Sequence, residues 1–325
     1  MDNMTFRTAV EPKPWVEKID YRSHIVCLGS CFADNIAKRL ASSKFRVTAS
    51  PTGILFNPAS IARSMELMTG NRHIDENALI ELGDRFVSYD FHSSIAGHSR
   101  EEAIENMNNA LRMGGEAIKN CDLLIATLGT AWVYRLVESG EVVANCHKQP
   151  ASLFERRLLS VAEVVKALER IVELAPRRVI FTLSPVRHLG EGLEDNSLSK
   201  SVLRVAINEI CRLHHERVAY FPSYEIMMDD LRDYRFYDAD MLHPSSVAVE
   251  YIAQRFFDVA LSAEAKALKL KVDKIVEASQ HRPFDHRSAN YRRFCQQQLE
   301  AIESLKGVDL SKEKAEFSEK LQINL

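Results

Sequence analysis

Short apolar runs alternate along the chain with longer stretches in which apolar residues recur every three or four positions. The first pattern predicts buried strands and the second predicts helices. Strands are expected near residues 24–28, 45–49, 122–128, 178–183 and 217–221, and helices at 31–42, 61–68, 100–120, 161–174 and 199–216. Strands that alternate with helices are typical of βαβ units, so the sequence predicts an α/β fold around a parallel sheet.

One segment departs from this alternation and predicts a β-hairpin. Residues 132–137 and 142–145 alternate between apolar and polar positions on either side of a turn that contains Gly140. The polar loop that follows, Asn145 to Pro150, contains His147. Asn145 and His147 are therefore candidates for substrate contact, and a structured turn before the proline is the alternative interpretation.

The end of the chain has a different composition. From about residue 262 it is rich in Ala, Lys and Glu, which predicts helices outside the sheet, including one at 288–305 after an interruption at Pro283. Packing on the domain, self-association into a homo-oligomer and covering the site are three uses for that helix. The last fifteen residues are charged and are expected to fray. We therefore predict two parts, 1–261 and 262–325.

Two local motifs carry candidate chemistry. The first predicted strand ends in Gly29 and Ser30 and passes directly into a helix. A serine there lies at the positive end of the helix dipole, where an oxyanion is stabilised, but it also suits a simple N-cap. Asp240 precedes His243 by three residues, and a carboxylate beside a histidine holds the imidazole in one tautomer, as a general base requires. Ser30, Asp240 and His243 are thus a candidate triad.

The chain resembles the GSCFA-domain proteins, whose name is the string Gly29-Ser30-Cys31-Phe32-Ala33. Further blocks match in order over roughly residues 5 to 300: 51–58, 127–132, 145–148, 183–188 and 240–244. The resemblance implies the fold of SGNH or GDSL-like hydrolases, a flavodoxin-like three-layer α/β/α sandwich with a central parallel sheet and a Ser-Asp-His triad. The first part, 1–261, would then be the catalytic domain, with the hairpin as an insertion and the helices as an extension.

The same resemblance assigns oxyanion and substrate positions. It places the second SGNH block at Gly53, with the N–H groups of Ser30 and Gly53 facing the oxyanion. The third block departs from the pattern, because Gly129 is followed by Thr130 and the expected asparagine is absent. Asn57 and Asn145 are the preferred replacements, ahead of Thr130, since an oxyanion hole needs a donor of the right reach.

Another block places Arg187 in a loop that faces the site by resemblance. Its fork of donors suits a carboxylate or a phosphate of the substrate. Solvation of the loop is the alternative interpretation.

Composition limits the function classes. The chain has 325 residues and a formal net charge of -3, without a basic stripe, so nucleic-acid binding is not expected. No apolar run reaches the roughly 18 residues of a membrane span, and Met1 to Arg7 does not look like a leader, which predicts a cytoplasmic protein. Six cysteines without paired metal spacing predict reduced thiols, no metal and no cofactor.

The leading hypothesis is a serine esterase acting on an O-acyl ester, such as a short acyl group on a glycan or small metabolite. An acyltransferase would use the same acyl-enzyme with a sugar hydroxyl as acceptor. A non-catalytic carbohydrate- or partner-binding protein is the alternative that the missing asparagine favours. A thiol nucleophile at Cys31 is less favoured, because its place one step into the helix turns it toward the core.

Overall fold

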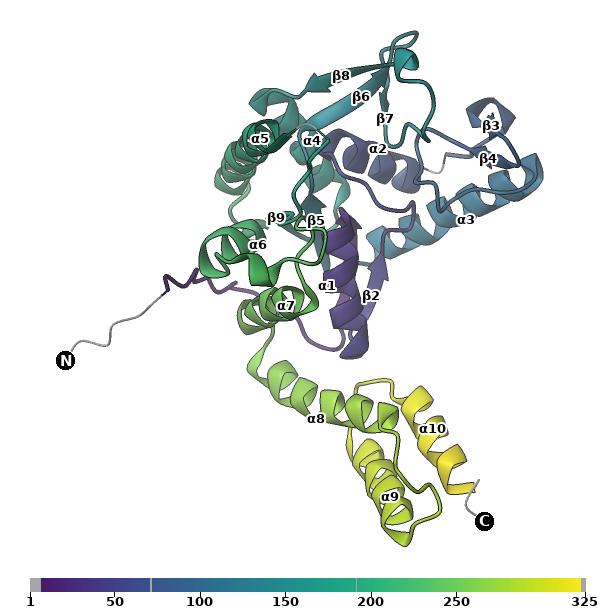
Figure 1. The fold of residues 1–325 in the computed structure, drawn as a ribbon, viewed down its shortest axis with the longest axis vertical. Helices are drawn as coiled ribbons and strands as arrows, with labels where there is room; N and C mark the ends of the chain where they lie inside the picture. Colours follow the sequence, from purple (N-terminus) through teal and green to yellow (C-terminus); the bar gives the residue numbers. More distant parts are fainter. Residues whose placement is uncertain (1–6, 71, 191, 323–325) are drawn as a thin grey trace, which may run out of the picture.

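A five-stranded parallel sheet forms the centre of the computed structural model, which describes residues 7–70, 72–190 and 192–322 (Figure 1). Its strands are β1 (His24–Gly29), β2 (Arg46–Ala49), β5 (Leu123–Leu128), β9 (Arg178–Leu183) and β10 (Val218–Phe221). All neighbouring pairs are parallel, in the order β10-β9-β5-β1-β2. The five predicted strands are confirmed; β1 and β5 are continuous apolar runs because helices cover both faces of the sheet.

Helices lie on both faces of the sheet. They are α1 (Cys31–Ser42), α2 (Pro58–Thr69), α3 (Arg100–Lys119), α4 (Val161–Leu174), α5 (Gly192–Leu213) and α7 (Ser246–Ala260). Ile25 and Cys27 of β1 pack with α1 and α7, whereas Val26 and Leu28 belong to the core formed with the other four helices. This alternation follows from the period of two along a strand. The result is a mixed α/β domain with one helical layer on each face.

Helices α2 and α5 begin earlier than predicted. The Asn57 side chain caps α2 and Pro58 occupies its first turn, which moves the start three residues before Ile61. The polar first turns of α5 hide its helical pattern before Ser199. Short helical segments complete the domain: η1 (Glu76–Ala78), η2 (Ala151–Leu153), α6 (Ser223–Glu225), the π-helical η3 (Ile226–Asp230) and η4 (Tyr234–Phe236).

The strand order places Ser30 at the point where doubly wound sheets bind their ligands. Counted among the five parallel strands, the order is 2-1-3-4-5, the flavodoxin-like arrangement of doubly wound sheets. The direction of winding reverses between β1 and β5, and ligands of such sheets bind beyond the carboxyl ends of the strands at that point. Ser30 follows β1 directly, and Gly129 follows β5 directly.

Small antiparallel elements flank the domain. The predicted hairpin forms as β6 (Trp132–Leu136) and β7 (Val142–Val143), and β8 (Phe154–Leu158) pairs along the other side of β6. The second strand is shorter than predicted, because the N–H groups of Ala144 and Asn145 turn to the carbonyl of Tyr89. A further hairpin, β3 (Ile80–Leu82) and β4 (Arg85–Val87), was not predicted.

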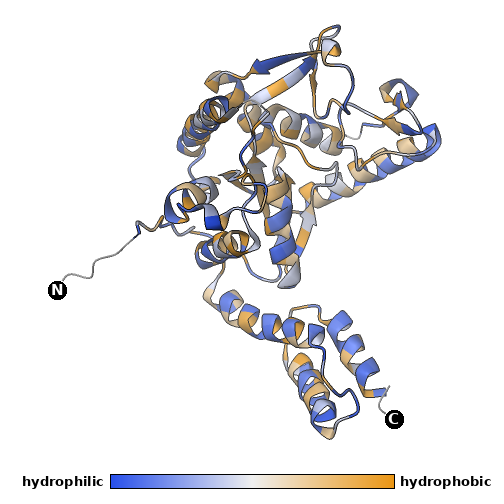
Figure 2. Ribbon diagram, viewed as in Figure 1, coloured by the Kyte–Doolittle hydropathy of each residue, from blue (hydrophilic) through white to orange (hydrophobic). Residues whose placement is uncertain are grey.

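The C-terminal helices form a separate unit beside the α/β domain (Figure 1). They are α8 (Ala263–Gln280), α9 (Ala289–Ser304) and α10 (Ser311–Gln322), and they share a small core. Their hydrophilic and hydrophobic bands are visible in Figure 2. The predicted fraying is wrong for residues 311–322, because Phe317 is fully buried in that core. Residues 323–325 lie outside the described residues.

The helical unit contacts the end of α1. The Ser43 hydroxyl donates to the Asp273 carboxylate of α8 at 2.7 Å. Lys44 forms an ion pair with the buried Glu313 of α10. Across the described residues, no helix is both long and apolar enough to cross a membrane.

Candidate active site

Ser30 lies at a sharp turn between β1 and α1. Gly29 has a φ of +123°, and a Cβ atom there would lie 2.1 Å from the carbonyl oxygen of Thr127, so the turn requires glycine. The Ser30 hydroxyl accepts a hydrogen bond from the Phe32 N–H at 3.3 Å and is the N-cap of α1. Ser30 as a whole is only 1% exposed. The N-cap interpretation is confirmed, and the same position puts the hydroxyl at the positive end of the helix.

Asp240 and His243 form a tightly organised pair. The Asp240 Oδ2 atom lies 2.6 Å from His243 Nδ1. Its other carboxylate oxygen accepts the backbone N–H groups of Leu242 and His243 at 2.8 and 2.9 Å. These contacts, led by the His243 N–H, lower the pKa of Asp240 to about 2. The carboxylate therefore stays ionised and fixes Nδ1 as the protonated nitrogen, which leaves Nε2 free to accept a proton.

A short bridge closes the loop that carries this pair. Tyr237 and Pro244 form an isolated antiparallel bridge, and the Asp238 N–H donates to the His243 carbonyl at 2.7 Å. The Arg187 N–H donates to the Leu242 carbonyl at 3.2 Å, which joins this loop to the one after β9. The Asp240 and His243 side chains remain about half exposed, at 45% and 47%. A substrate can therefore reach the imidazole.

The segment after β2 brings Asn57 to the carboxyl ends of β1 and β5. The Leu55 N–H donates to the Gly29 carbonyl at 2.9 Å, and the Gly129 N–H donates to the Phe56 carbonyl at 2.7 Å. The segment thus crosses between the ends of β1 and β5. The Asn57 Oδ1 atom accepts the Ser60 N–H at 2.8 Å, while its Nδ2 has no partner among the described residues. Asn57 is therefore the predicted donor whose N–H groups are unused at this edge.

Three other predicted oxyanion donors already have hydrogen-bond partners, which corrects the expectation drawn from the resemblance. The Ser30 N–H donates to the Thr127 carbonyl at 3.0 Å, and the Gly53 N–H donates to the Ser50 carbonyl at 2.8 Å. The Thr130 hydroxyl accepts the Trp132 N–H and contacts the Ser199 hydroxyl, each at 3.0 Å. In this structure none of these groups faces an open position.

Asn145 and His147 lie in a separate polar network. The buried His147 ring contacts the Ser88 carbonyl through Nε2 at 2.8 Å and the Ser93 hydroxyl through Nδ1 at 3.1 Å. The Asn145 amide donates to the same hydroxyl at 3.2 Å, and its oxygen accepts the His147 N–H. Burial lowers the pKa of His147. These contacts tie two loops together, so the structured-turn interpretation fits both residues, and the expectation of substrate contact does not.

Arg187 lines a small hollow together with residues of the segment that precedes Asp240. Its guanidinium lies over the rings of Tyr237 and Tyr234, at 4.2 and 5.4 Å from their centres. The hollow has a volume of about 220 Å³, and its other lining residues include Met227, Met228 and Leu231. A cation held by aromatic faces, without a carboxylate partner among the described residues, suits an anionic or sugar-bearing group.

Lys200 of α5 is a site residue that the sequence analysis missed. It is 2% exposed, and its ammonium donates to the carbonyls of Gly129 and Ser184, each at 2.7 Å. It thereby joins the loops after β5 and β9. A signal for it exists in the sequence: Asn196, Ser199 and Lys200 continue the apolar face that residues 203, 206, 207 and 210 form. Polar residues on a buried helical face indicate polar partners beneath it.

His188 is a buried histidine whose pKa responds to the charges of both Lys200 and His243. Its ring meets Phe56 edge-on, and its Nε2 is buried against Gly129 without a hydrogen-bond partner. Burial, followed by the charges of Lys200 and His243, lowers the pKa of His188 to about 4. His188 is therefore neutral near pH 7. Ser30 and His243, by contrast, share no hydrogen bond in this structure, although both belong to the carboxyl edge.

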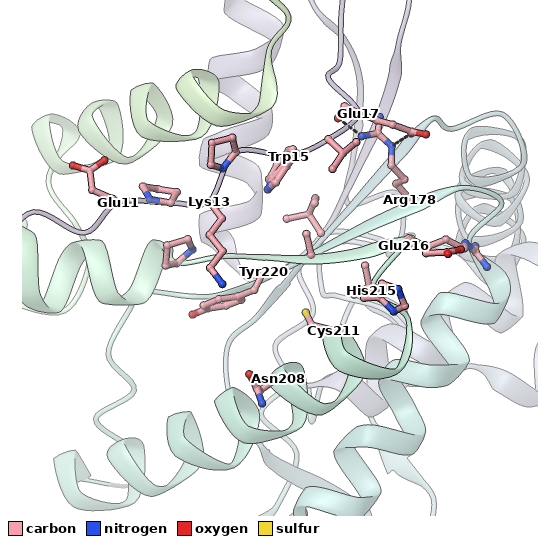
Figure 3. Close-up of a pocket in the computed structure, with 18 of the residues that line it drawn as sticks. Glu11, Lys13, Trp15, Glu17, Arg178, Asn208, Cys211, His215, Glu216 and Tyr220 are labelled. Atoms are coloured by element: carbon pink, nitrogen blue, oxygen red, sulfur yellow. Dashed lines mark hydrogen bonds and ion pairs between the residues drawn. The ribbon is translucent and has the colours of Figure 1, made fainter.

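A larger hollow, of about 920 Å³, lies along β10 and contains none of the predicted site residues. Figure 3 shows Lys13 and Trp15 on one side of it, Tyr220 of β10 below, and Cys211 of α5 opposite. Three of its lining carboxylates are paired: Glu225 with Arg204 and Tyr220, Glu17 with Arg178, and Glu11 with Arg255. Burial raises the pKa of Cys211 to about 11. This hollow therefore lacks an activated nucleophile.

The environment of Cys31 does not activate its thiol. Burial, followed by the charge of Asp34, raises the pKa of Cys31, so its thiol is protonated near neutral pH. Over the described ranges, no group of three His, Cys, Asp or Glu side chains is placed to hold a metal ion.

Comparisons with known proteins match two segments of the chain. A sequence model of the GSCFA family matches residues 24–256. A second model, of the C-terminal domain of GSCFA domain proteins, matches residues 272–323. No curated protein matches the chain.

Proposed function

The chain belongs to the GSCFA family, and from this premise we propose that it is a serine hydrolase of the SGNH type that cleaves an O-acyl ester. The observation that carries the proposal is the Asp240 and His243 pair, with its 2.6 Å contact and doubly clamped carboxylate. If Asp240 only capped a structural turn, the His243 imidazole would have no role in it. Here the ring is oriented, half exposed and located on the sheet edge that carries Ser30.

In the proposed reaction, His243 Nε2 removes the proton of the Ser30 hydroxyl as its oxygen attacks the ester carbonyl carbon. The carbonyl π electrons move to oxygen and form a tetrahedral oxyanion. His243 then gives its proton to the leaving alcohol as the ester C–O bond breaks. Water attacks the resulting acyl-Ser30 with the same base and releases the acid. Asp240 stays ionised throughout and stabilises the imidazolium.

Asn57 is the proposed side-chain donor to the oxyanion, because its Nδ2 is unused and its segment joins the ends of β1 and β5. The N-terminus of α1 adds its positive end at Ser30. Donors in a water-poor site contribute on the order of 3 kcal/mol each to transition-state stabilisation. Asn57 thus takes the place of the asparagine that is absent after Gly129.

The hollow beside Arg187 is the proposed site for one end of the substrate. Its guanidinium and tyrosine faces favour an ester whose alcohol or acyl part bears a sugar ring or an anionic group. If a sugar hydroxyl replaces water in the second step, the same acyl-enzyme performs acyl transfer.

A non-catalytic binding protein is the second candidate. The observation in its favour is that the Ser30 and Gly53 N–H groups already donate to backbone carbonyls. The two candidates make opposite predictions for covalent labelling of Ser30.

The test treats the full chain with a fluorophosphonate and measures intact mass and hydrolysis of short aryl esters. The expected result is a single adduct on Ser30 that is lost in Ser30→Ala and His243→Ala and retained in His147→Gln. Absence of both adduct and hydrolysis in the wild-type chain contradicts the hydrolase and supports the binding protein.

A further inference from the structure

The loop between α8 and α9 concentrates positive charge on a chain that is negative overall. Between residues 278 and 299 the chain has four arginines and a single acidic residue, Asp285, whereas its net charge is -3. The arginines are exposed and form no ion pair with any described residue: Arg282, Arg287, Arg292 and Arg293. We call this surface, together with Phe284, the basic tip. The loop leads to the end of α9 that lies away from the α/β domain (Figure 1).

Phe284 projects from the basic tip and is fully exposed. The neighbouring aromatic residues Tyr291 and Phe294 instead pack in the core of the helical unit. A solvated phenylalanine ring carries an unfavourable hydration free energy that is recovered when the ring enters an apolar or interfacial environment.

Local contacts hold the base of this loop in place. The His281 ring meets Phe294, and the His286 ring meets Tyr291 edge-on. The Asp285 carboxylate accepts the Arg287 N–H at 2.8 Å. Phe284 therefore projects from an organised loop, and its exposure needs no unfolding of the helices.

We propose that the basic tip docks the protein onto an anionic lipid surface, with the Phe284 ring in the headgroup region and the arginines on lipid phosphates. The charge of the tip complements such a surface, and guanidinium groups bind phosphate in a bidentate manner. This is a peripheral contact, and it is independent of the proposed hydrolase activity.

The arrangement favours a membrane over a nucleic acid. Single strands are bound in a groove where several aromatic side chains stack on successive bases. The basic tip instead projects one exposed ring from the end of a helical hairpin, and its exposed arginines lie in the same loop and in the first two turns of α9. That shape matches a flat interface, where one ring inserts and the charges lie at headgroup level.

The test is co-sedimentation of the full chain with vesicles of phosphatidylcholine, with and without 30% phosphatidylglycerol, at low and high salt. We expect binding to the anionic vesicles that weakens with salt. Arg282→Gln with Arg287→Gln should weaken partitioning about 25-fold, since each arginine contributes about fivefold. Phe284→Ser should weaken it about fivefold. The matched control, Arg72→Gln with Arg112→Gln, removes the same charge from exposed positions of the α/β domain.

Each outcome decides the proposal. Loss of binding in the tip variants, with the control unchanged, supports it. Absence of binding to anionic vesicles, or equal weakening by the control variant, overturns it. Tip-dependent binding of a 20-nucleotide single-stranded RNA without vesicle binding also overturns it and assigns the tip to nucleic acid.

Discussion

Ser30→Ala separates the two roles that Ser30 has in the structure and in the proposal. As the N-cap of α1, the hydroxyl accepts one hydrogen bond from the Phe32 N–H at 3.3 Å. Loss of a serine cap typically costs about 1 kcal/mol of unfolding free energy, and this long bond places the loss toward 0.5 kcal/mol. For a domain of this size, such a loss lowers the melting temperature by about 1 to 4 °C. The variant therefore stays folded at 25 °C.

Ser99→Ala supplies the matched control. Ser99 caps α3 through the Glu102 N–H at 3.1 Å and is exposed. The variant therefore loses a comparable hydrogen bond at a position away from Ser30. Both variants are melted by circular dichroism and assayed for ester hydrolysis at 25 °C. We expect similar small shifts in melting temperature, with hydrolysis lost only in Ser30→Ala. Two results refute the reasoning: hydrolysis retained in Ser30→Ala, or a destabilisation above about 3 kcal/mol, which a cap alone does not explain.

Four further predictions address the geometry of the site. Asp240→Asn should reduce kcat by about 10³- to 10⁴-fold with little change in KM, because His243 loses the carboxylate that selects its tautomer. In the wild-type chain the pKa of Asp240 is lowered to about 2, so the stability that its ionised form contributes is present above pH 4 and is lost as the pH falls through 2. An acid limb of the pH–rate profile above pH 4 must then belong to another group, and a profile that follows the carboxylate contradicts this. Gly29→Ala should abolish folding in a circular-dichroism melt, since its Cβ would lie 2.1 Å from a carbonyl oxygen of β5. The control Gly140→Ala, with φ +71° and open space around it, should lower the unfolding free energy by only about 1 kcal/mol. Lys200→Met should lower the unfolding free energy by about 2 to 4 kcal/mol, because two buried carbonyls lose their charged donor; an unchanged urea midpoint would count against that role.

The central sheet could be predicted because its strands are buried on both faces and therefore appear as continuous apolar runs. Strand β8 has the sequence Phe-Glu-Arg-Arg-Leu, and its polar side chains face solvent, so it has no such run. The three-residue strands β3 and β4 are too short for any period to show. Fraying of the C-terminus was predicted from its charge alone, and charge does not reveal that Phe317 of α10 is buried.

The candidate site also has a part that the sequence predicts and a part that it does not. Gly29 with Ser30, and Asp240 with His243, are local motifs, so their spacing indicates the turn and the contact directly. The acceptors of the Gly53 and Ser30 N–H groups depend on neighbouring strands and turns, and a sequence does not display them. Lys200 requires knowing which face of α5 lies over the loops after β5 and β9.

Helix α1 begins at the candidate site and ends against the C-terminal helices. Its twelve residues make a rod of about 18 Å, with Ser30 at its start. Directly beyond its last turn, Ser43 and Lys44 hold α8 and α10. The two family segments are separate along the chain. A cut between them would leave Glu313 without its ion-pair partner Lys44 and would expose the C-terminal end of α1 to water. The family segment 24–256 expressed alone would therefore expose a surface that the full chain covers, so experiments on Ser30 belong on the full chain.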